Sequence, residues 1–154
     1  MGLPASGIQI IVALTIPEGL LADIRAHCRS AYPNECCGAL VGTLGPHAKT
    51  VTQVVELENA EPVSPERRFS IDPRRLLLVE REATSNKLAI VGFYHSHPDS
   101  PARPSLTDLE WAWPVYSYVI VSTDCAEVVE TRSFVLDDAG VGKRFVEEAV
   151  EILA

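Results

Sequence analysis

The chain has 154 residues, of which 47% are hydrophobic and 22% are charged, an ordinary composition for a globular protein with one hydrophobic core. Its formal net charge of -8 opposes binding to nucleic-acid phosphates. No apolar run approaches the roughly 20 residues of a membrane span, and residues 1–10 lack the pattern of a secretion signal. We therefore expect a cytoplasmic protein that binds neither nucleic acid nor a membrane, with a single domain over residues 1–154.

Hydrophobic periodicity predicts strands and helices in a mixed order along the chain. Strands are expected over residues 8–14, 37–42, 51–57, 69–71, 88–95, 115–122 and 128–136. Helices are expected over residues 17–30, 73–86 and 105–111, with Asp72 available to cap the second. The proline-rich segments 58–68 and 97–104 are expected to be loops, and residues 142–154 are assigned to a closing strand in preference to a helix. Strands, hairpins and helices in this order predict an α/β or α+β sandwich.

Two histidines lie at the end of the most strand-like segment. His95 and His97 are separated by one residue, and side chains at i and i+2 of a strand point to the same face. Both imidazoles can therefore converge on one point. Either histidine alone would more often be an ordinary polar residue at a strand end.

An acidic residue follows at the start of the next helix. Seven residues separate His97 from Ser105, and Asp108 falls in the first helical turn after that serine. A serine followed three residues later by an acid also fits a capping box, which would explain both residues without a metal. With two histidines upstream, a carboxylate here favours a catalytic zinc site with three protein ligands and one open position.

A hydrolytic zinc site also needs a general base. The chain has no HExxH motif, so this group must come from elsewhere. Glu35 is the candidate, because it directly precedes the apolar stretch of residues 36–42, where a casual solvated position is unfavourable. On spacing alone, a solvated surface carboxylate remains the alternative.

Together these residues resemble the JAMM (MPN+) metallopeptidases, and in particular the bacterial single-domain type. The resemblance extends beyond the metal-site residues and covers about residues 10–136. Its most characteristic segments are residues 33–38, 68–73 and 92–98.

The resemblance implies a role for each of these residues. His95, His97 and Asp108 would bind one zinc ion per chain, Glu35 would be the general acid/base, and the hydroxyl of Ser105 would stabilise the oxyanion of the tetrahedral intermediate. It also implies an α/β, single-domain fold with a mixed, curved β-sheet sandwiched by helices, similar to that of cytidine deaminases.

Members of this family cut peptide or isopeptide bonds next to the C-terminal Gly-Gly of ubiquitin-like proteins. The bacterial members process small sulfur carrier proteins, so the expected partner is a ubiquitin-like sulfur carrier protein. Two other functions stay open: a non-catalytic MPN-type scaffold for protein assembly, and a zinc amidohydrolase that acts on small molecules.

The cysteines and tryptophans have less specific interpretations. No two cysteines form a CxxC pair, so neither a disulfide framework nor a cysteine zinc site is predicted. The adjacent Cys36 and Cys37 could form a redox gate beside Glu35 or contact a thiocarboxylate substrate, but burial as small hydrophobes is commoner. Trp111 and Trp113 are expected in the core rather than on a substrate-binding surface.

Overall fold

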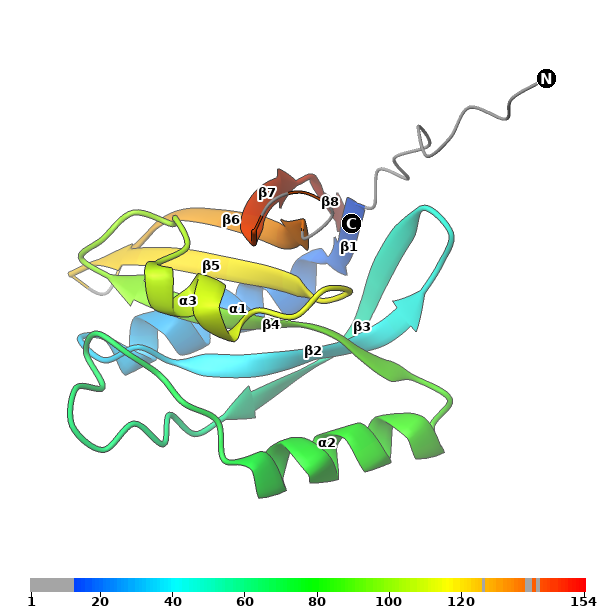
Figure 1. Cartoon of the computed structure of the whole chain (residues 1–154), viewed down its shortest axis with the longest axis horizontal. Helices are drawn as coiled ribbons and strands as arrows, with labels where there is room; N and C mark the ends of the chain where they lie inside the picture. The colour runs from blue at the N-terminus through cyan, green and yellow to red at the C-terminus, as the bar shows by residue number, and fades with distance from the viewer. Residues whose placement is uncertain (1–12, 126, 138–139, 141) are drawn as a thin grey trace.

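The fold is described by a computed structural model that covers residues 13–125, 127–137, 140 and 142–154 (Figure 1). Within these residues the elements are, in chain order, β1 (Ala13–Pro17), α1 (Glu18–Ala31), β2 (Cys37–Leu44), β3 (Ala48–Leu57), α2 (Pro73–Ser85), β4 (Ala89–Pro98), α3 (Leu106–Trp111), β5 (Ser117–Asp124), β6 (Glu127–Asp137), β7 (Arg144–Glu148) and β8 (Val150–Leu153). None of the helices formed by these residues has the length and apolar character that crossing a membrane requires.

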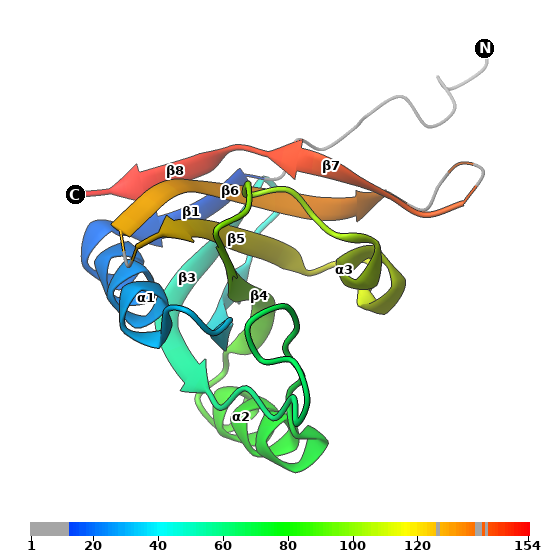
Figure 2. The same cartoon turned by 90° about the vertical axis from the view of Figure 1, so that its left-hand side faces the viewer.

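The strands form one eight-stranded sheet in the order β7-β6-β5-β4-β2-β3-β1-β8. The sheet is mixed, because β4 pairs with β5 and β1 pairs with β3 and β8 in parallel, whereas the other pairs are antiparallel. The consecutive strands β7 and β8 lie at opposite ends of this order, so the sheet must curl until its two edges approach each other. Figure 2 shows β7 and β8 following one another along that junction. The predicted mixed, curved sheet is confirmed. Residues 142–154 are extended as expected, but they form two strands on opposite edges of the sheet, β7 and β8, rather than one closing strand.

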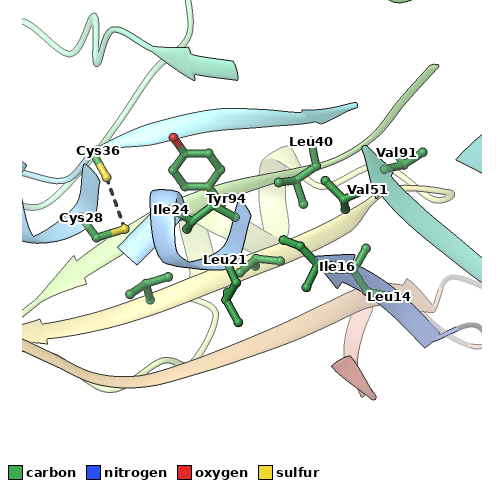
Figure 3. Packing of buried hydrophobic residues seen from close by; sticks show 12 residues of the cluster. Leu14, Ile16, Leu21, Ile24, Cys28, Cys36, Leu40, Val51, Val91 and Tyr94 are labelled. Atoms are coloured by element: carbon green, nitrogen blue, oxygen red, sulfur yellow. Dashed lines mark hydrogen bonds between the residues drawn. The ribbon is translucent and has the colours of Figure 1, made fainter. Parts of the chain in front are cut away.

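Helices cover both faces of the sheet. Ile24 of α1 packs with Leu40 of β2 in the larger cluster of buried residues (Figure 3). Val79 of α2 packs with Ala39 and Val41 of the same strand in a second cluster. Successive residues of a strand point to opposite faces, so β2 supplies both cores and is buried on each side.

Local capping sets the start of two helices as predicted. Asp72 accepts a hydrogen bond from the backbone N–H of Arg74 at 2.9 Å, and Pro73 occupies the first helical position of α2. Ser105 and Asp108 form a complete capping box at the start of α3. Each cap satisfies backbone donors that the first helical turn leaves without partners.

Some predicted strand limits differ from those observed. Residues 8–12 of the first predicted strand lie outside the described residues, and the observed strand continues to Pro17, which pairs with Leu153. The predicted connection over residues 43–50 is shorter than expected, because β2 and β3 extend to Leu44 and Ala48.

The strand predicted over residues 69–71 is wrong. Ser70 accepts one backbone hydrogen bond from Ala60 at 2.9 Å, but its own N–H donates to the side chain of Asn59 at 3.2 Å. A side chain thus takes the place of the next backbone partner. The segment stays part of the loop between β3 and α2.

The core position predicted for the tryptophans is also wrong. Trp111 and Trp113 are 73% and 68% exposed. Helix α3 has only six residues, none of them buried, so it turns at the rim of the sheet without placing an aromatic face against the core.

The close approach of β2 and β3 generates a stability prediction. A Cβ atom on Gly42 would lie 1.8 Å from the backbone oxygen of Thr50, whereas one on Gly19 in α1 meets nothing within 4 Å. Gly42→Ala should lower the free energy of unfolding by about 2–3 kcal/mol, because the clashing atom is backbone. Urea denaturation measures this change.

Gly19→Ala is the matched control. It replaces a helical glycine in open space and should leave stability unchanged or raise it by up to about 1 kcal/mol. Equal effects of the two substitutions would contradict the packing described for Gly42.

Candidate metal centre

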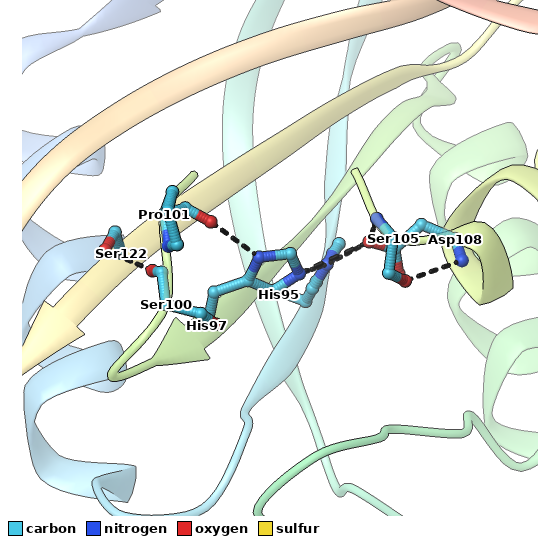
Figure 4. A network of polar contacts seen from close by, with 7 residues as sticks. All are labelled: His95, His97, Ser100, Pro101, Ser105, Asp108 and Ser122. Atoms are coloured by element: carbon cyan, nitrogen blue, oxygen red, sulfur yellow. Dashed lines mark hydrogen bonds and ion pairs between the residues drawn. The ribbon is translucent and has the colours of Figure 1, made fainter. Parts of the chain in front are cut away.

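Three ligand atoms from two elements meet at the end of β4. The Nε2 atoms of His95 and His97 lie 3.0 Å apart, and Oδ2 of Asp108 lies 3.3 Å from each of them (Figure 4). Both histidines belong to β4, which runs through Pro98 rather than ending at residue 95. Strand geometry therefore points both rings the same way, as the spacing predicted.

These distances test whether the residues fit a metal ion. A tetrahedral zinc ion with bonds of about 2.0–2.1 Å holds its ligand atoms about 3.3–3.4 Å apart. The observed separations of 3.0 and 3.3 Å are close to that value. Two imidazoles and a carboxylate in this arrangement can hold one small divalent cation.

The rings of the two histidines are oriented by neighbouring groups. Nδ1 of His97 lies 2.9 Å from the carbonyl oxygen of Pro101, so it is the protonated nitrogen and Nε2 keeps its lone pair for a ligand. The ring of Phe69 stacks on His95 with centroids 4.6 Å apart and an interplanar angle of 28°.

Asp108 takes part in the capping box and in the ligand cluster at once. Its Oδ2 accepts the backbone N–H of Ser105 at 2.8 Å, while Oγ of Ser105 accepts the N–H of Asp108 at 3.0 Å. The capping interpretation and the metal interpretation are therefore not alternatives, because the cap aims the carboxylate at the histidines.

Charge in the cluster supports an ionised carboxylate. Burial alone would raise the pKa of Asp108, but the nearby His95 and His97 outweigh it and hold that pKa well below its usual range. For His97, burial lowers the pKa, but the hydrogen bonds to Asp108 and Pro101 and the nearby acidic charges together outweigh it, so the net shift is upward.

Glu35 completes the constellation from another element. It is only 6% exposed, and its carboxylate forms a group with the imidazoles of His95 and His97 in which all ligand atoms lie within 4.8 Å of one another. Burial raises the pKa of Glu35 to about 8, with smaller opposing effects from its neighbours. It is therefore not the solvated surface carboxylate that spacing alone left open.

An asparagine missed by the sequence analysis fixes the backbone around Glu35. The amide nitrogen of Asn59 donates to the carbonyl oxygens of Glu35 at 3.0 Å and Arg68 at 2.9 Å. Its oxygen accepts the backbone N–H groups of Glu61 and Ser70. One side chain thus joins the start of β2 to the loop that carries Phe69. The only signal in the sequence is an asparagine opening a proline-rich segment, a common turn residue.

Comparison with known proteins agrees with this geometry. Residues 17–137 match the family described as prokaryotic homologs of the JAB domain. The chain belongs to this family. It is 37% identical over 114 residues to a probable TtuB-protein conjugate cleaving protease of Thermus thermophilus, covering 73% of this chain and 72% of the relative. It is 33% identical over 144 residues to the CysO-cysteine peptidase of Mycobacterium tuberculosis, covering 93% of each.

A solved structure supports the assignment of the fold. A protein from Desulfitobacterium hafniense superposes with a TM-score of 0.77 at 34% identity, and the match covers 91% of this chain and 92% of that one. The JAMM resemblance drawn from the sequence is confirmed, as is the fold that it implied.

The role of Asn59 can be tested through the loop that it holds. Asn59→Asp removes the N–H donors to the carbonyl oxygens of Glu35, Pro65 and Arg68. It also turns a carboxylate toward these carbonyls, so hydrogen bonds worth about 1 kcal/mol each are lost. Under native conditions, trypsin should then cleave after Arg67 or Arg68 roughly 10-fold faster, because local opening is easier. Peptide mapping over time measures the rate.

Asn86→Asp is the control for that substitution. The amide of Asn86 donates to the carbonyl of Glu82 at the end of α2, far along the chain from the cleavage sites. Equal cleavage rates in the two variants would show that Asn59 does not hold the loop.

Burial of Glu35 predicts a pH dependence of stability in the metal-free protein. The pKa of Glu35 is raised from 4.5 to about 8 on folding, so the folded state keeps a proton that the unfolded state releases. Its contribution to the free energy of unfolding should fall as pH rises from about 4.5 to 8 and level off above. Denaturation of the unmodified protein and of Glu35→Gln at several pH values measures this contribution. Parallel curves for the two proteins would contradict the prediction.

Proposed function

We propose that this protein is a zinc-dependent peptidase that hydrolyses the bond after the C-terminal Gly-Gly of a small ubiquitin-like sulfur carrier protein. The observation that carries the proposal is the convergence of two imidazole nitrogens and one carboxylate oxygen beside a second, buried carboxylate. A structural ion would need no such acid next to an open ligand position. The pairing of ligand set and acid is typical of hydrolysis.

In this proposal His95, His97 and Asp108 hold the zinc ion, one per chain. When bound there, zinc supplies Lewis acidity that polarises a carbonyl group and makes water easier to deprotonate. His97 is kept in the required tautomer by Pro101, and Asp108 is kept in place by its cap with Ser105.

Glu35 moves the proton in the reaction. Its raised pKa suits a group that accepts a proton from the attacking water and returns it to the leaving amine near neutral pH. Its backbone hydrogen-bonds to Pro65 at 2.8 Å and to Asn59 at 3.0 Å, so the loop between β3 and α2 holds it in position.

Ser105 supplies a donor for the developing oxyanion. Its Oγ already accepts the N–H of Asp108, and a hydroxyl that accepts one hydrogen bond still has its own proton to donate. The residue is exposed at the start of α3, next to the ligand cluster. A fixed donor in this place stabilises negative charge on the substrate.

The substrate class follows from the family and from the site. The names of the relatives describe cleavage of a protein conjugate and of a cysteine adduct, and both substrates can present an extended C-terminal tail. A Gly-Gly tail has no side chains to keep it away from a buried acid. We also infer a cytoplasmic location, because the four cysteines are free thiols and such thiols persist in reducing compartments.

The direct test uses zinc-loaded protein and ubiquitin-like proteins whose Gly-Gly is extended by further residues. Mass spectrometry should show a product ending at Gly-Gly, and a chelator should abolish it. Glu35→Gln should keep about one zinc per chain but lose about 10²–10⁴-fold in turnover. His97→Ala should lose zinc and activity together, because it removes a ligand.

Glu80→Gln, an equivalent change on the exposed face of α2, is the control and should behave as the unmodified protein. Retention of full turnover by Glu35→Gln would remove that residue from the mechanism. Bound zinc without cleavage of any carrier would indicate a small-molecule amidohydrolase, and absence of zinc would indicate a scaffold.

A further inference from the structure

Two buried thiols lie in contact next to the candidate metal centre, and the proposed reaction uses neither. The sulfur atoms of Cys28 on α1 and Cys36 just before β2 are 3.5 Å apart, and the two residues are 0% and 3% exposed (Figure 3). The neighbouring Cys37 is not part of this pair. It packs in the opposite core, where its sulfur contacts the carbonyl oxygens of Leu57 and Glu58.

The two thiols have different chemical environments. The hydrogen bond with Cys28 lowers the pKa of Cys36, burial opposes this, and His27 lowers it further, to a value of about 5. The same hydrogen bond and burial raise the pKa of Cys28. Cys36 is therefore the more acidic thiol of the pair and the one that reacts first with an oxidant.

Cys36 is also connected both to Glu35 and to the strand that carries the two histidines. It follows Glu35 directly in the chain. Its backbone N–H donates to Oγ of Ser96 at 2.9 Å, and its carbonyl oxygen accepts the N–H of Ser96 at 3.1 Å. Ser96 lies between the ligands His95 and His97, so any displacement of Cys36 reaches the general base and the histidines together.

From this geometry we propose that Cys28 and Cys36 form an oxidation-sensitive dithiol, a modification site at which hydrogen peroxide creates a disulfide that disables the neighbouring metal centre. The effect on activity depends on the function proposed above, whereas disulfide formation does not. A disulfide bond is about 2.05 Å long, so the sulfur atoms must approach each other by about 1.5 Å. Shifts of about 1 Å in a catalytic group can cost about 100-fold in rate.

The chemistry balances with one equivalent of peroxide. The sulfur of Cys36 attacks an oxygen of hydrogen peroxide, the O–O bond breaks, and the departing hydroxide takes up a proton to become water. The resulting sulfenic acid of Cys36 is attacked by the sulfur of Cys28, the S–O bond breaks, and the proton of Cys28 leaves with the oxygen as a second water. The sulfur atoms lose two electrons, and the peroxide gains them. Both thiols are buried, which favours a small oxidant over a bulky disulfide.

Peroxide treatment of the full, zinc-loaded chain tests the proposal. After remaining thiols are blocked, peptide mapping should show a cross-link between Cys28 and Cys36 with the loss of two hydrogens. Turnover should fall by about 100-fold, zinc content should stay near one per chain, and dithiothreitol should restore activity. Absence of the cross-link, or a cross-link that leaves turnover unchanged, would overturn the proposal.

Variants separate this pair from the other thiols. Cys28→Ala and Cys28→Ser should keep activity within about two-fold of the unmodified protein, so a folding defect in one does not decide the result. Neither variant should form the Cys28–Cys36 disulfide, and neither should show a loss of activity after peroxide that dithiothreitol reverses. Cys125→Ser removes the exposed thiol and should still be inactivated reversibly. Should the reduced protein cleave no carrier, the proposed function fails, while the mapping still decides whether the dithiol forms.

Discussion

The pairing of β2 with β4 is the interaction on which the rest of the site depends. Cys37 lies opposite His95 and Gly38 lies opposite Tyr94 in the antiparallel register. Glu35, two residues before β2, is thereby brought to His95 and His97, which are 60 and 62 positions later in the chain. Gly38 makes this register feasible. A Cβ atom there would lie 2.2 Å from the ring of Tyr94, which crosses β2 to meet His27. The sheet register thus decides where Glu35 lies.

The parallel pairing of β4 with β5 brings Asp108 to the two histidines. Because β4 and β5 are parallel, the chain must travel from the end of β4 back to the end of the sheet where β4 began. It does so through the loop after Pro98 and the short helix α3. The helix begins with its capping box at the end of β4, where Asp108 meets the imidazoles. A longer or more buried helix would carry its first turn elsewhere. The exposure of Trp111 in α3 and of Trp113 just after it follows from this position.

The site places a carboxylate, two imidazoles and a second carboxylate in a largely buried space. Such a set is costly without a cation, as the raised pKa of Glu35 indicates, and a bound divalent ion offsets that cost. The neighbouring hydrogen bonds of Asn59, Pro101 and Ser105 fix the positions of these groups. Burying these groups together lowers the stability of the folded protein but fixes the geometry of the site, as is common at functional centres.

The sequence alone determined the features of the site that depend on neighbouring residues. Alternation along a strand aligned His95 with His97, and short-range capping rules located Asp72 and Ser105, because these features depend on backbone geometry within a few residues. The mixed curved sheet and the family also followed from motifs in the chain.

Only the tertiary structure decided what meets across long separations. It placed Glu35 beside the histidines, joined Asn59 to the backbone on both sides of the site, and paired Cys36 with Cys28 rather than with its neighbour Cys37. Adjacent residues at the start of a strand point to opposite faces, so Cys36 and Cys37 enter different cores. The partner of each is set by sheet register and helix packing, which no local pattern encodes.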